Sequence, residues 1–427
     1  MLKKLTSRIK SLSGDKKSVL ALVGGSTVAQ ALSFLLSPIQ TRLFSPEVFG
    51  ELSVFTSITG VVGAIICLRY ELAVVLPKED DESFALLKLS WLFAALVSGV
   101  TLIVFGFFRT QIYMQFNALA LTRYWYYVPI TLLLMGIIQS ANYWLTRKRQ
   151  FTVLSYNKVL PVLVGYMISI GLGLAGNRAL GARLFSTLAG NIINIAVIAW
   201  VIVPEMRMKG RKKFRTIELI KKYKNFAIYD IWGSSINNLS WMIIPILMNY
   251  YFGSFAAGQY SIGLRVIQLP ISIIGASVGQ VFMQSASEKR NTRELYPYTI
   301  KIIKMLFLYT LPFALLIFFF GKILFKIAFG DKWEIAGLYA QILSPWAMIW
   351  FLSNPISSLY SVLQKQNIHL IIAIINLITR FLSLYLGAKL NSPVLGIVFF
   401  SVSGSVVYFV FLIVAVLLAK DNSRFFK

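Results

Sequence analysis

Long apolar runs recur from one end of the sequence to the other, separated by short segments that carry Lys and Arg. A helix of about 20 mostly apolar residues is long enough to cross the hydrocarbon core of a bilayer. The pattern therefore predicts an all-α polytopic membrane protein of about twelve transmembrane helices. The expected spans are 19–44, 48–75, 84–108, 124–146, 152–176, 180–203, 225–250, 255–284, 299–330, 334–364, 366–388 and 393–419.

The composition supports this class of protein. Hydrophobic residues make up 57% of the 427 residues, and the mean hydropathy is +0.71. Charged residues make up 14%, whereas a soluble protein carries roughly 25%. The segments between the expected spans leave no room for a large soluble domain.

The net charge of +26 raises the question of nucleic-acid binding. With these spans, thirty Lys and Arg residues fall on one side of the membrane and eight on the other. This asymmetry is the positive-inside signal, so we expect both termini in the cytoplasm. The richest basic block, residues 207–224, is expected to lie against anionic lipid headgroups, and nucleic acid is not expected as a partner.

The N-terminal segment has features of a signal peptide, because six Lys and Arg residues precede an apolar stretch that contains Ala29-Gln30-Ala31. The apolar stretch continues to Phe44, so an uncleaved first span is expected. Cys67 is the single cysteine and His369 the single histidine. The sequence therefore excludes a disulfide within the chain and a cysteine-based metal site, and no metal or cofactor is expected.

The two halves of the chain share a weak repeat. At an offset of 208 residues, Phe44, Gly50 and Ser53 fall on Phe252, Gly258 and Ser261, in the common frame F-x5-G-x2-S. The repeat predicts two six-helix lobes in parallel orientation around a central cavity. The expected domains are an N-lobe (1–203), a basic cytoplasmic linker (204–224) and a C-lobe (225–427).

Polar and small residues recur at steps of three and four in several spans, which places them on one helix face. In span 255–284 the series is Ser261, Arg265, Gln268, Ser272, Gly275 and Gly279. In span 366–388 it is Asn376, Arg380, Ser383 and Gly387. Shorter series contain Gln30 in the first span and Asp230, Ser234, Asn237 and Trp241, with Asn238 adjacent, in the seventh.

Two interpretations of these stripes remain open. Small and polar residues can mediate close packing and hydrogen bonds between helices. Alternatively, the stripes line a water-accessible cavity, which the arginines favour because an Arg at mid-span costs roughly 2.5–3.5 kcal/mol unless it faces protein or water. Neither Arg265 nor Arg380 has an acidic residue at matching depth in the sequence.

We therefore expect a cationic cavity that receives an anion, since the fork of Arg binds two phosphate oxygens at once. Pairing of the arginines with backbone groups, or snorkelling toward the interface, is the alternative. The expected cavity residues are Arg265, Arg380, Arg69, Gln268, Asn376, Gln30, Asn237, Asn238 and Trp241. The candidate acids for ion coupling are Asp230, Glu71 and Glu51.

Three segments carry a resemblance to a known family: 26–55 (STVAQALSFLLSPIQTRLFSPEVFGELSVF), 69–90 (RYELAVVLPKEDDESFALLKLS) and 258–288 (GQYSIGLRVIQLPISIIGASVGQVFMQSASE). The chain resembles the Wzx-type polysaccharide flippases, which export O-antigen and capsule, within the multidrug/oligosaccharidyl-lipid/polysaccharide (MOP) exporter superfamily. The likeness extends over nearly the full length. It rests on hydrophobic patterns with a few fixed points.

The resemblance implies that two lobes alternate between inward- and outward-open states. It implies a substrate made of undecaprenyl-pyrophosphate-linked oligosaccharide, moved from the cytoplasmic to the periplasmic leaflet of the bacterial inner membrane. Arg265 and Arg380, with Arg69, match the cavity arginines that relatives use for the anionic head. A polymerase and glycosyltransferases of the same pathway are the expected protein partners.

Three other functions are alternatives to a flippase. An exporter of cationic drugs from the same superfamily needs buried carboxylates, which are scarce at mid-depth here. A membrane-embedded polymerase, ligase or glycosyltransferase needs a sizeable loop with paired acids or His. The acidic run KEDDE (78–82) is expected to be a solvated cytoplasmic loop and not an active site, so no enzymatic activity is expected. A non-transporting scaffold within an export complex stays open.

Overall fold

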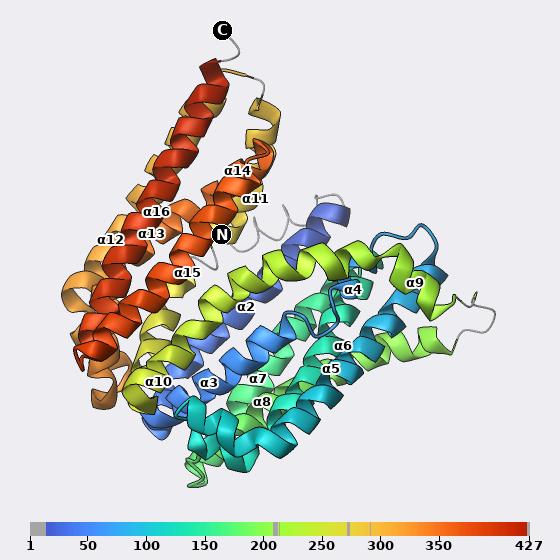
Figure 1. The fold of residues 1–427 in the computed structure, drawn as a ribbon, viewed down its shortest axis with the longest axis horizontal. Helices are drawn as coiled ribbons and strands as arrows, with labels where there is room; N and C mark the ends of the chain where they lie inside the picture. The colour runs from blue at the N-terminus through green and yellow to red at the C-terminus, as the bar shows by residue number, and fades with distance from the viewer. Residues whose placement is uncertain (1–13, 208–211, 213, 271–273, 291, 425–427) are drawn as a thin grey trace, which may run out of the picture. The chain divides into compact units, whose positions relative to one another are not determined.

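The computed structural model describes residues 14–207, 212, 214–270, 274–290 and 292–424. Every secondary-structure element in these ranges is a helix (Figure 1). The longer helices are α2 (Gly14–Leu43), α3 (Pro46–Gly63), α5 (Asp80–Gln115), α6 (Tyr127–Arg147), α7 (Phe151–Leu174), α8 (Leu180–Met206), α10 (Ile231–Pro270), α11 (Ala276–Lys289), α12 (Leu295–Phe329), α13 (Glu334–Ile356), α15 (Gln366–Lys389) and α16 (Pro393–Arg424). The shorter ones are α4 (Tyr70–Ala73), η1 (Leu119–Tyr124), α9 (Thr216–Lys222), η2 (Phe226–Asp230), η4 (Asp331–Trp333) and α14 (Ser358–Val362).

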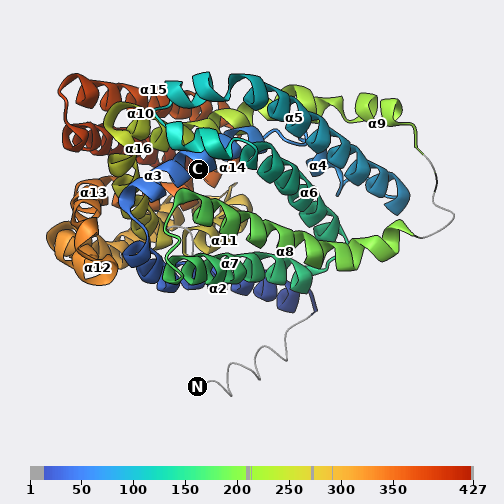
Figure 2. The ribbon, with the colours of Figure 1, turned by 90° about the horizontal axis from the view of Figure 1, so that it is seen from below.

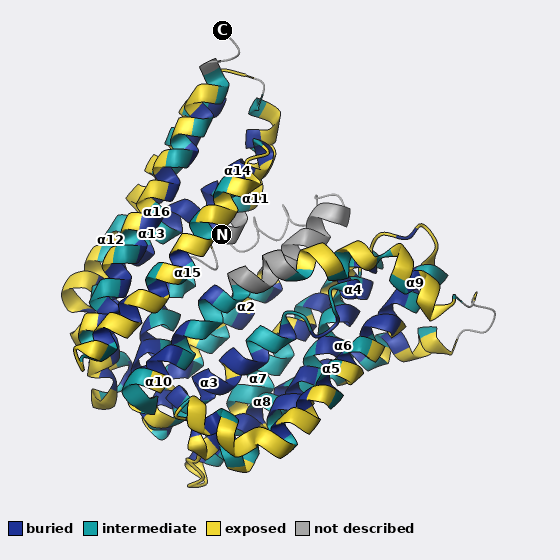
Figure 3. Ribbon diagram, viewed as in Figure 1, coloured by how far each residue is buried: buried dark blue, intermediate teal, exposed yellow. Residues whose placement is uncertain are grey.

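The expected all-α membrane fold is confirmed, and the chain is a multi-pass membrane protein. Within the described residues, nine helices are long and apolar enough to cross a membrane. Large apolar side chains lie exposed along α12, with Leu308 at 69% and Phe319 at 64% exposure (Figure 3). Apolar side chains left exposed in such rows are typical of a surface that faces lipid. The count of twelve spans stays a prediction.

One expected span has an internal break, and two others are joined in one helix. The span 48–75 is divided into α3 and α4 by a turn in which Leu68 and Arg69 have φ of 48° and 65°. The spans 225–250 and 255–284 join into α10, which kinks at Gly253 with φ of 82°. Glycine has no Cβ and therefore adopts this positive φ without a steric clash, so one residue replaces the expected loop.

The chain divides into two compact units. Unit 1 comprises residues 1–44, 55–114 and 119–238, and unit 2 comprises 45–54, 115–118 and 239–427. These divisions place residues 225–238 with the first unit and the start of α3 with the second. The lobe boundaries expected from the sequence stay a prediction.

Each unit has its own apolar core. In unit 1, buried residues of α5, α6 and α8 pack together, including Leu86, Trp144 and Ile202, and Figure 2 shows these helices in the same bundle. In unit 2, α11, α14 and α16 contribute Phe282, Tyr360 and Ala415. Helix α13 lies at the centre of this unit. Of its membrane-spanning apolar stretch, 56% is buried, against 22% of the corresponding stretch of α12.

The repeat seen in the sequence has a physical cause within unit 2. Helices α3 and α10 cross so closely that a Cβ on Gly50 would lie 1.8 Å from the Ser254 carbonyl oxygen. A Cβ on Gly258, its counterpart in the repeat, would lie 1.9 Å from the Pro46 carbonyl oxygen. Only glycine allows backbones to approach to this distance.

The serine of each repeat makes the same hydrogen bond. The Ser53 hydroxyl donates to the Gly50 carbonyl oxygen at 2.6 Å, and the Ser261 hydroxyl donates to the Gly258 carbonyl oxygen at 2.9 Å. The motif F-x5-G-x2-S thus marks two equivalent helix starts that meet at their glycines.

Candidate functional site

Arg265 lies on the half-exposed face of α10. Ser261, Arg265 and Gln268 are half-buried, whereas Ile262, Val266 and Ile267 on the other face are buried. Among the residues that the structure describes, Arg265 has no hydrogen-bond or ion-pair partner. The expectation of an unpaired arginine on a polar stripe therefore holds for Arg265, and a charge in this setting needs water or a ligand.

Arg380 lies in a different environment, inside unit 2. Its side chain is 1% exposed, and its Nη1 donates to the backbone oxygen and the hydroxyl of Ser240, both at 2.9 Å. Its Nη2 donates to the Tyr408 hydroxyl at 3.3 Å. The guanidinium stacks over the Trp241 ring, 4.2 Å from the ring centroid, which is a cation–π contact.

The whole polar stripe of α15 is buried. Asn376 and Ser383 are buried, and the Ser383 hydroxyl lies 3.0 Å from that of Ser403 on α16. In this structure the stripe packs against neighbouring helices, as the helix-packing interpretation expected. A substrate-binding role for Arg380 and Asn376 stays a prediction.

Trp241 belongs to an aromatic cluster and does not stand alone. Its ring centroid lies 4.6 Å from that of Trp350, and Trp350 stacks on Trp346 with an interplanar angle of 12°. Asn238 donates its side-chain amide to the Gly60 carbonyl oxygen at 2.7 Å within unit 1. Gln30 is half-buried, and the Asn237 side chain lies outside the described part of the chain.

In unit 1, Arg69 joins two of the candidate coupling acids. Arg69 Nη2 lies 3.0 Å from Asp230 Oδ2, and Nη1 lies 3.5 Å from Glu71 Oε1. Glu71 is 1% exposed and accepts a hydrogen bond from Gln139 at 3.2 Å, whereas its Oε2 has no hydrogen-bond partner among the described residues. One guanidinium thus contacts two carboxylates, so a change in the charge of either acid alters its ion pairs.

The turn between α3 and α4 creates this cluster. The left-handed backbone of Leu68 and Arg69 interrupts the span, so that Arg69 lies beside the π-helical turn η2, which ends at Asp230. Irregular backbone of this kind concentrates at functional sites. Glu51, the third candidate acid, is half-buried on α3 and takes no part in the cluster.

The comparisons with known proteins identify the family. The model of the family described as "Polysaccharide biosynthesis protein" matches residues 39–336, which is more than half of the chain. The chain belongs to this family. The matched region of the family member includes Arg69, Asp230 and Arg265 and ends before Arg380. No curated protein matches the chain.

Solved structures show that this family member has the fold of the MOP superfamily. The lipid II flippase MurJ in an inward closed conformation has a TM-score of 0.73 and 14% identity, covering 96% of this chain and 90% of that one. An inward-facing MATE multidrug resistance transporter has a TM-score of 0.69 and 14% identity, covering 92% and 96%. A MOP transporter from Pyrococcus furiosus, described as having a binding pocket of reverse polarity, has a TM-score of 0.58 and 15% identity, covering 95% and 96%.

The expected resemblance to the polysaccharide flippases is thus confirmed for family and fold. At these identities the solved structures support the fold and carry no substrate across. Within the described residues, no group of His, Cys, Asp and Glu could hold a metal ion.

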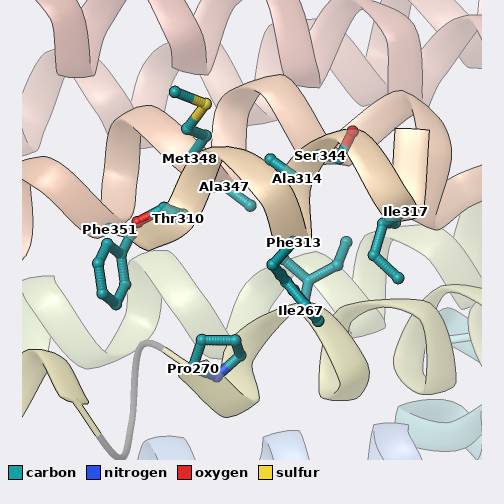
Figure 4. Close-up of a pocket in the computed structure, with 10 residues that line it drawn as sticks. All are labelled: Ile267, Pro270, Thr310, Phe313, Ala314, Ile317, Ser344, Ala347, Met348 and Phe351. Carbon is teal, nitrogen blue, oxygen red and sulfur yellow. The ribbon is translucent and has the colours of Figure 1, made fainter. Parts of the chain in front are cut away.

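A small cavity of about 20 Å³ beside Pro270 in unit 2 is not a candidate site (Figure 4). Its lining is apolar except for Thr310 and Ser344, whose hydroxyls donate to backbone carbonyls of their own helices. The volume suffices for about one water molecule.

Helix α8 of this family member carries a further polar face, which is not among the stripes predicted from the sequence. On α8, Arg183, Thr187, Asn191 and Asn194 follow one another at steps of four and three, and Arg183 and Asn194 are buried. The spacing of three and four was visible in the sequence. Arg183 lies close to the start of the expected span 180–203, so by position it belongs to the eight basic residues of the side opposite the termini.

Lys78, Glu79 and Asp80 of the KEDDE run (78–82) are exposed, and its acids also form ion pairs. Helix α5 begins at Asp80, whose carboxylate binds Arg147 at 2.9 Å and also pairs with Lys148. Glu82 accepts hydrogen bonds from Lys222 and from the Tyr223 hydroxyl. The hydrogen bond to Glu82 raises the pKa of the Lys222 ammonium. The acidic run therefore holds the basic segment before α10.

Proposed function

We propose that this protein is a flippase that moves an undecaprenyl-pyrophosphate-linked oligosaccharide across the bacterial inner membrane by alternating access. The substrate class comes from the polysaccharide biosynthesis family, and the membrane-spanning fold supports a transport function. The O-antigen or capsule repeat unit is the glycan class that the proposal names. Both termini are proposed to be cytoplasmic, from the charge asymmetry of the segments between the spans.

The single observation that carries the proposal is Arg265. It is a permanent cation on an apolar helix, half-exposed and without a partner among the described residues. A pyrophosphate offers several anionic oxygens in the geometry that a guanidinium binds with two parallel hydrogen bonds. Arg265 therefore fits the anionic head of the substrate, with Gln268 one turn away as a hydrogen-bonding neighbour.

The Arg69 cluster supports a role in coupling. It lies at a break between helices, where a proton or a cation can alter the Arg69–Asp230 pair. We propose no enzymatic step and no cofactor. The polymerase and glycosyltransferases that make and use the lipid-linked glycan are the proposed partners.

The rival with most support from the fold is a small-molecule exporter of the same superfamily. Cationic drugs require carboxylates that no cation of the protein already binds, whereas Glu71 and Asp230 are both ion-paired with Arg69. The unpaired Arg265 favours an anionic substrate instead.

The experiment is a flipping assay with the purified, full-length protein in proteoliposomes and a fluorescent undecaprenyl-pyrophosphate-linked sugar. Arg265→Ala is expected to lower the flipping rate at least tenfold, because a hydrogen-bonded charge pair contributes about 1.5–3 kcal/mol. Arg265→Lys keeps the charge without the fork and is expected to be intermediate. Arg178→Ala, which removes an exposed arginine, is the matched control and should flip at the wild-type rate. Wild-type flipping by Arg265→Ala would exclude the proposed role of Arg265.

A further inference from the structure

A pocket of unit 2 lies where α3 and α13 begin and α12 ends. Its volume is about 630 Å³, which is within the range of pockets that bind small ligands. The charged residues that line it are Glu47, Lys322, Asp331, Lys332 and Glu334. None of them belongs to the Arg265 stripe or to the Arg69 cluster.

The helix ends around this pocket are fixed to one another. Gln259 of α10 is fully buried, and its Nε2 donates to the Lys332 carbonyl oxygen at 2.6 Å. Its Oε1 accepts a hydrogen bond from the Ala336 backbone N–H at 2.9 Å. The rings of Phe49 on α3 and Trp333 pack edge to face, with their centroids 5.1 Å apart. The pocket is therefore carried by ordered helix ends that buried contacts hold in place.

Most of the charges in this pocket have no counter-charge. Asp331 pairs with Lys326, the Nζ and Oδ1 atoms lying 3.3 Å apart. Within the described part of the chain, the other four form no ion pair: Glu47, Lys322, Lys332 and Glu334. Two carboxylates and two ammonium groups thus line one space without pairing. A ligand with a single charge is repelled by one of these signs, whereas a zwitterion can pair with both.

The pocket also has an apolar side, which continues onto the lipid-facing surface of α12. Phe255 and Ile335 line the pocket, and both are exposed. Next to Lys322 along α12, Phe319 and Ile323 are exposed as well. Exposed apolar side chains at the end of a membrane helix suit the acyl chains of a lipid. The surroundings of the pocket therefore suit a ligand with a charged head and an apolar tail.

We infer that this pocket binds a phosphoethanolamine group, whose ammonium meets Glu47 and Glu334 and whose phosphate meets Lys322 and Lys332. A primary ammonium donates three hydrogen bonds, whereas the trimethylammonium of choline has no N–H to donate. The headgroup of phosphatidylglycerol has no cation and leaves both carboxylates without a partner.

Two molecules can supply this group. In phosphatidylethanolamine the acyl chains cover the exposed side chains of α12, and a water-soluble molecule that carries phosphoethanolamine offers the same head alone. Binding here goes beyond the proposed flipping reaction and does not depend on it.

The test measures binding to the purified, full-length protein in detergent by native mass spectrometry. Phosphatidylethanolamine, phosphatidylcholine and phosphatidylglycerol with the same acyl chains are titrated separately, and so is free phosphoethanolamine. Phosphatidylethanolamine is expected to bind about tenfold more tightly than phosphatidylcholine, which forms no hydrogen bonds to the carboxylates. It is also expected to bind more tightly than phosphatidylglycerol, because the carboxylates repel an anionic head.

Two double variants assign the binding to this pocket. Glu47→Gln with Glu334→Gln removes both unpaired carboxylates, and Lys322→Gln with Lys332→Gln removes both unpaired ammonium groups. Each is expected to weaken the binding of phosphatidylethanolamine about two- to thirtyfold, the effect of two lost exposed ion pairs. The first variant should also bind phosphatidylglycerol more tightly than the wild type does, because the repulsion by the carboxylates is gone.

Matched controls make the same changes at exposed positions elsewhere in unit 2. Glu288→Gln on α11, and Lys301→Gln with Lys304→Gln near the start of α12, should bind phosphatidylethanolamine as the wild type does. Both lysines of this control lie at the end of α12 opposite Lys322, about 27 Å away at 1.5 Å per residue.

Weaker binding of free phosphoethanolamine than of phosphatidylethanolamine identifies the lipid as the source, and equal binding identifies a water-soluble molecule. The inference is wrong if phosphatidylcholine or phosphatidylglycerol binds as tightly as phosphatidylethanolamine, or if either double variant of the pocket binds with wild-type affinity. Such a result would leave the flipping assay of Arg265→Ala unaffected, so the two proposals fail separately.

Discussion

The crossing of α3 and α10 at Gly258 gives the sharpest stability prediction. Replacing Gly258 by Ala adds one methyl group whose carbon would lie 1.9 Å from the Pro46 carbonyl oxygen. Ordinary contacts begin at 3.4 Å, so the two backbones must separate by about 1.5 Å at this point. The obstacle is a carbonyl of the main chain and not the end of a flexible side chain, so no rotamer change removes the clash.

Overpacking a close-packed site costs about 1–3 kcal/mol, and we expect Gly258→Ala at or above the upper end of this range. For a large domain this corresponds to a melting temperature lower by about 5–10 °C. Gly263→Ala is expected to be milder, because its Cβ would lie 2.9 Å from the Ala336 carbonyl oxygen. Since Gly50 and Gly258 share one contact, the double substitution should destabilise less than the two single effects added together.

The assay is thermal unfolding of the purified full-length protein, followed by intrinsic fluorescence. Gly99→Ala is the matched control, because nothing lies within 4 Å of its added Cβ in the middle of α5. The free energy of unfolding of this control should rise by about 0.5–1 kcal/mol, because Ala has a higher helix propensity than Gly. If Gly258→Ala and Gly99→Ala unfold at the same temperature, the claim that the repeat glycines mark an obligatory backbone contact is refuted.

Two further predictions concern charged residues. Arg380 is buried among the neutral groups of Ser240, Tyr408 and Trp241. Arg380→Met should therefore keep or raise the melting temperature. Arg380→Ala should lower the free energy of unfolding by about 2–4 kcal/mol, because it leaves a cavity. Equal destabilisation by both would show that the charge itself stabilises unit 2. Glu82→Gln should release Lys222 and speed tryptic cleavage there by up to about fivefold at low salt, because the ion pair between the two side chains is lost. Cleavage at an unchanged rate would contradict a holding role for the acidic run.

Much of the fold was predictable because it depends on local pattern. Apolar runs of sufficient length form membrane helices. The helices α5, α12 and α16 could therefore be predicted from their sequence without tertiary information. The frame F-x5-G-x2-S located the two equivalent helix starts, since a backbone contact that tolerates only glycine leaves a trace in both halves of the sequence. The break at Leu68 and Arg69 gave no such signal, because nothing in either residue type marks a left-handed backbone.

The candidate sites show the limit of the same reasoning. The spacing of three and four correctly placed Arg265 and Arg380 on polar helix faces, and for Arg265 the absence of an acid at matching depth corresponds to a side chain without a partner among the described residues. Arg380 also has no acid at matching depth, but its guanidinium is not without partners. A backbone carbonyl, two hydroxyls and an indole ring take the place of the acid. Periodicity determines which residues share a face, whereas the partners of that face come from helices far away in the sequence.

The sequence by itself therefore determined the class of protein, its long apolar helices and the repeat, since these follow from hydrophobicity and from local sterics. Only the tertiary structure decided that the stripe of α15 is buried, that Arg69 bridges Glu71 and Asp230, and that Glu47 and Lys322 line one pocket. Each of these depends on how helices pack against one another, and the packing of side chains from distant segments is not encoded in any short stretch of residues.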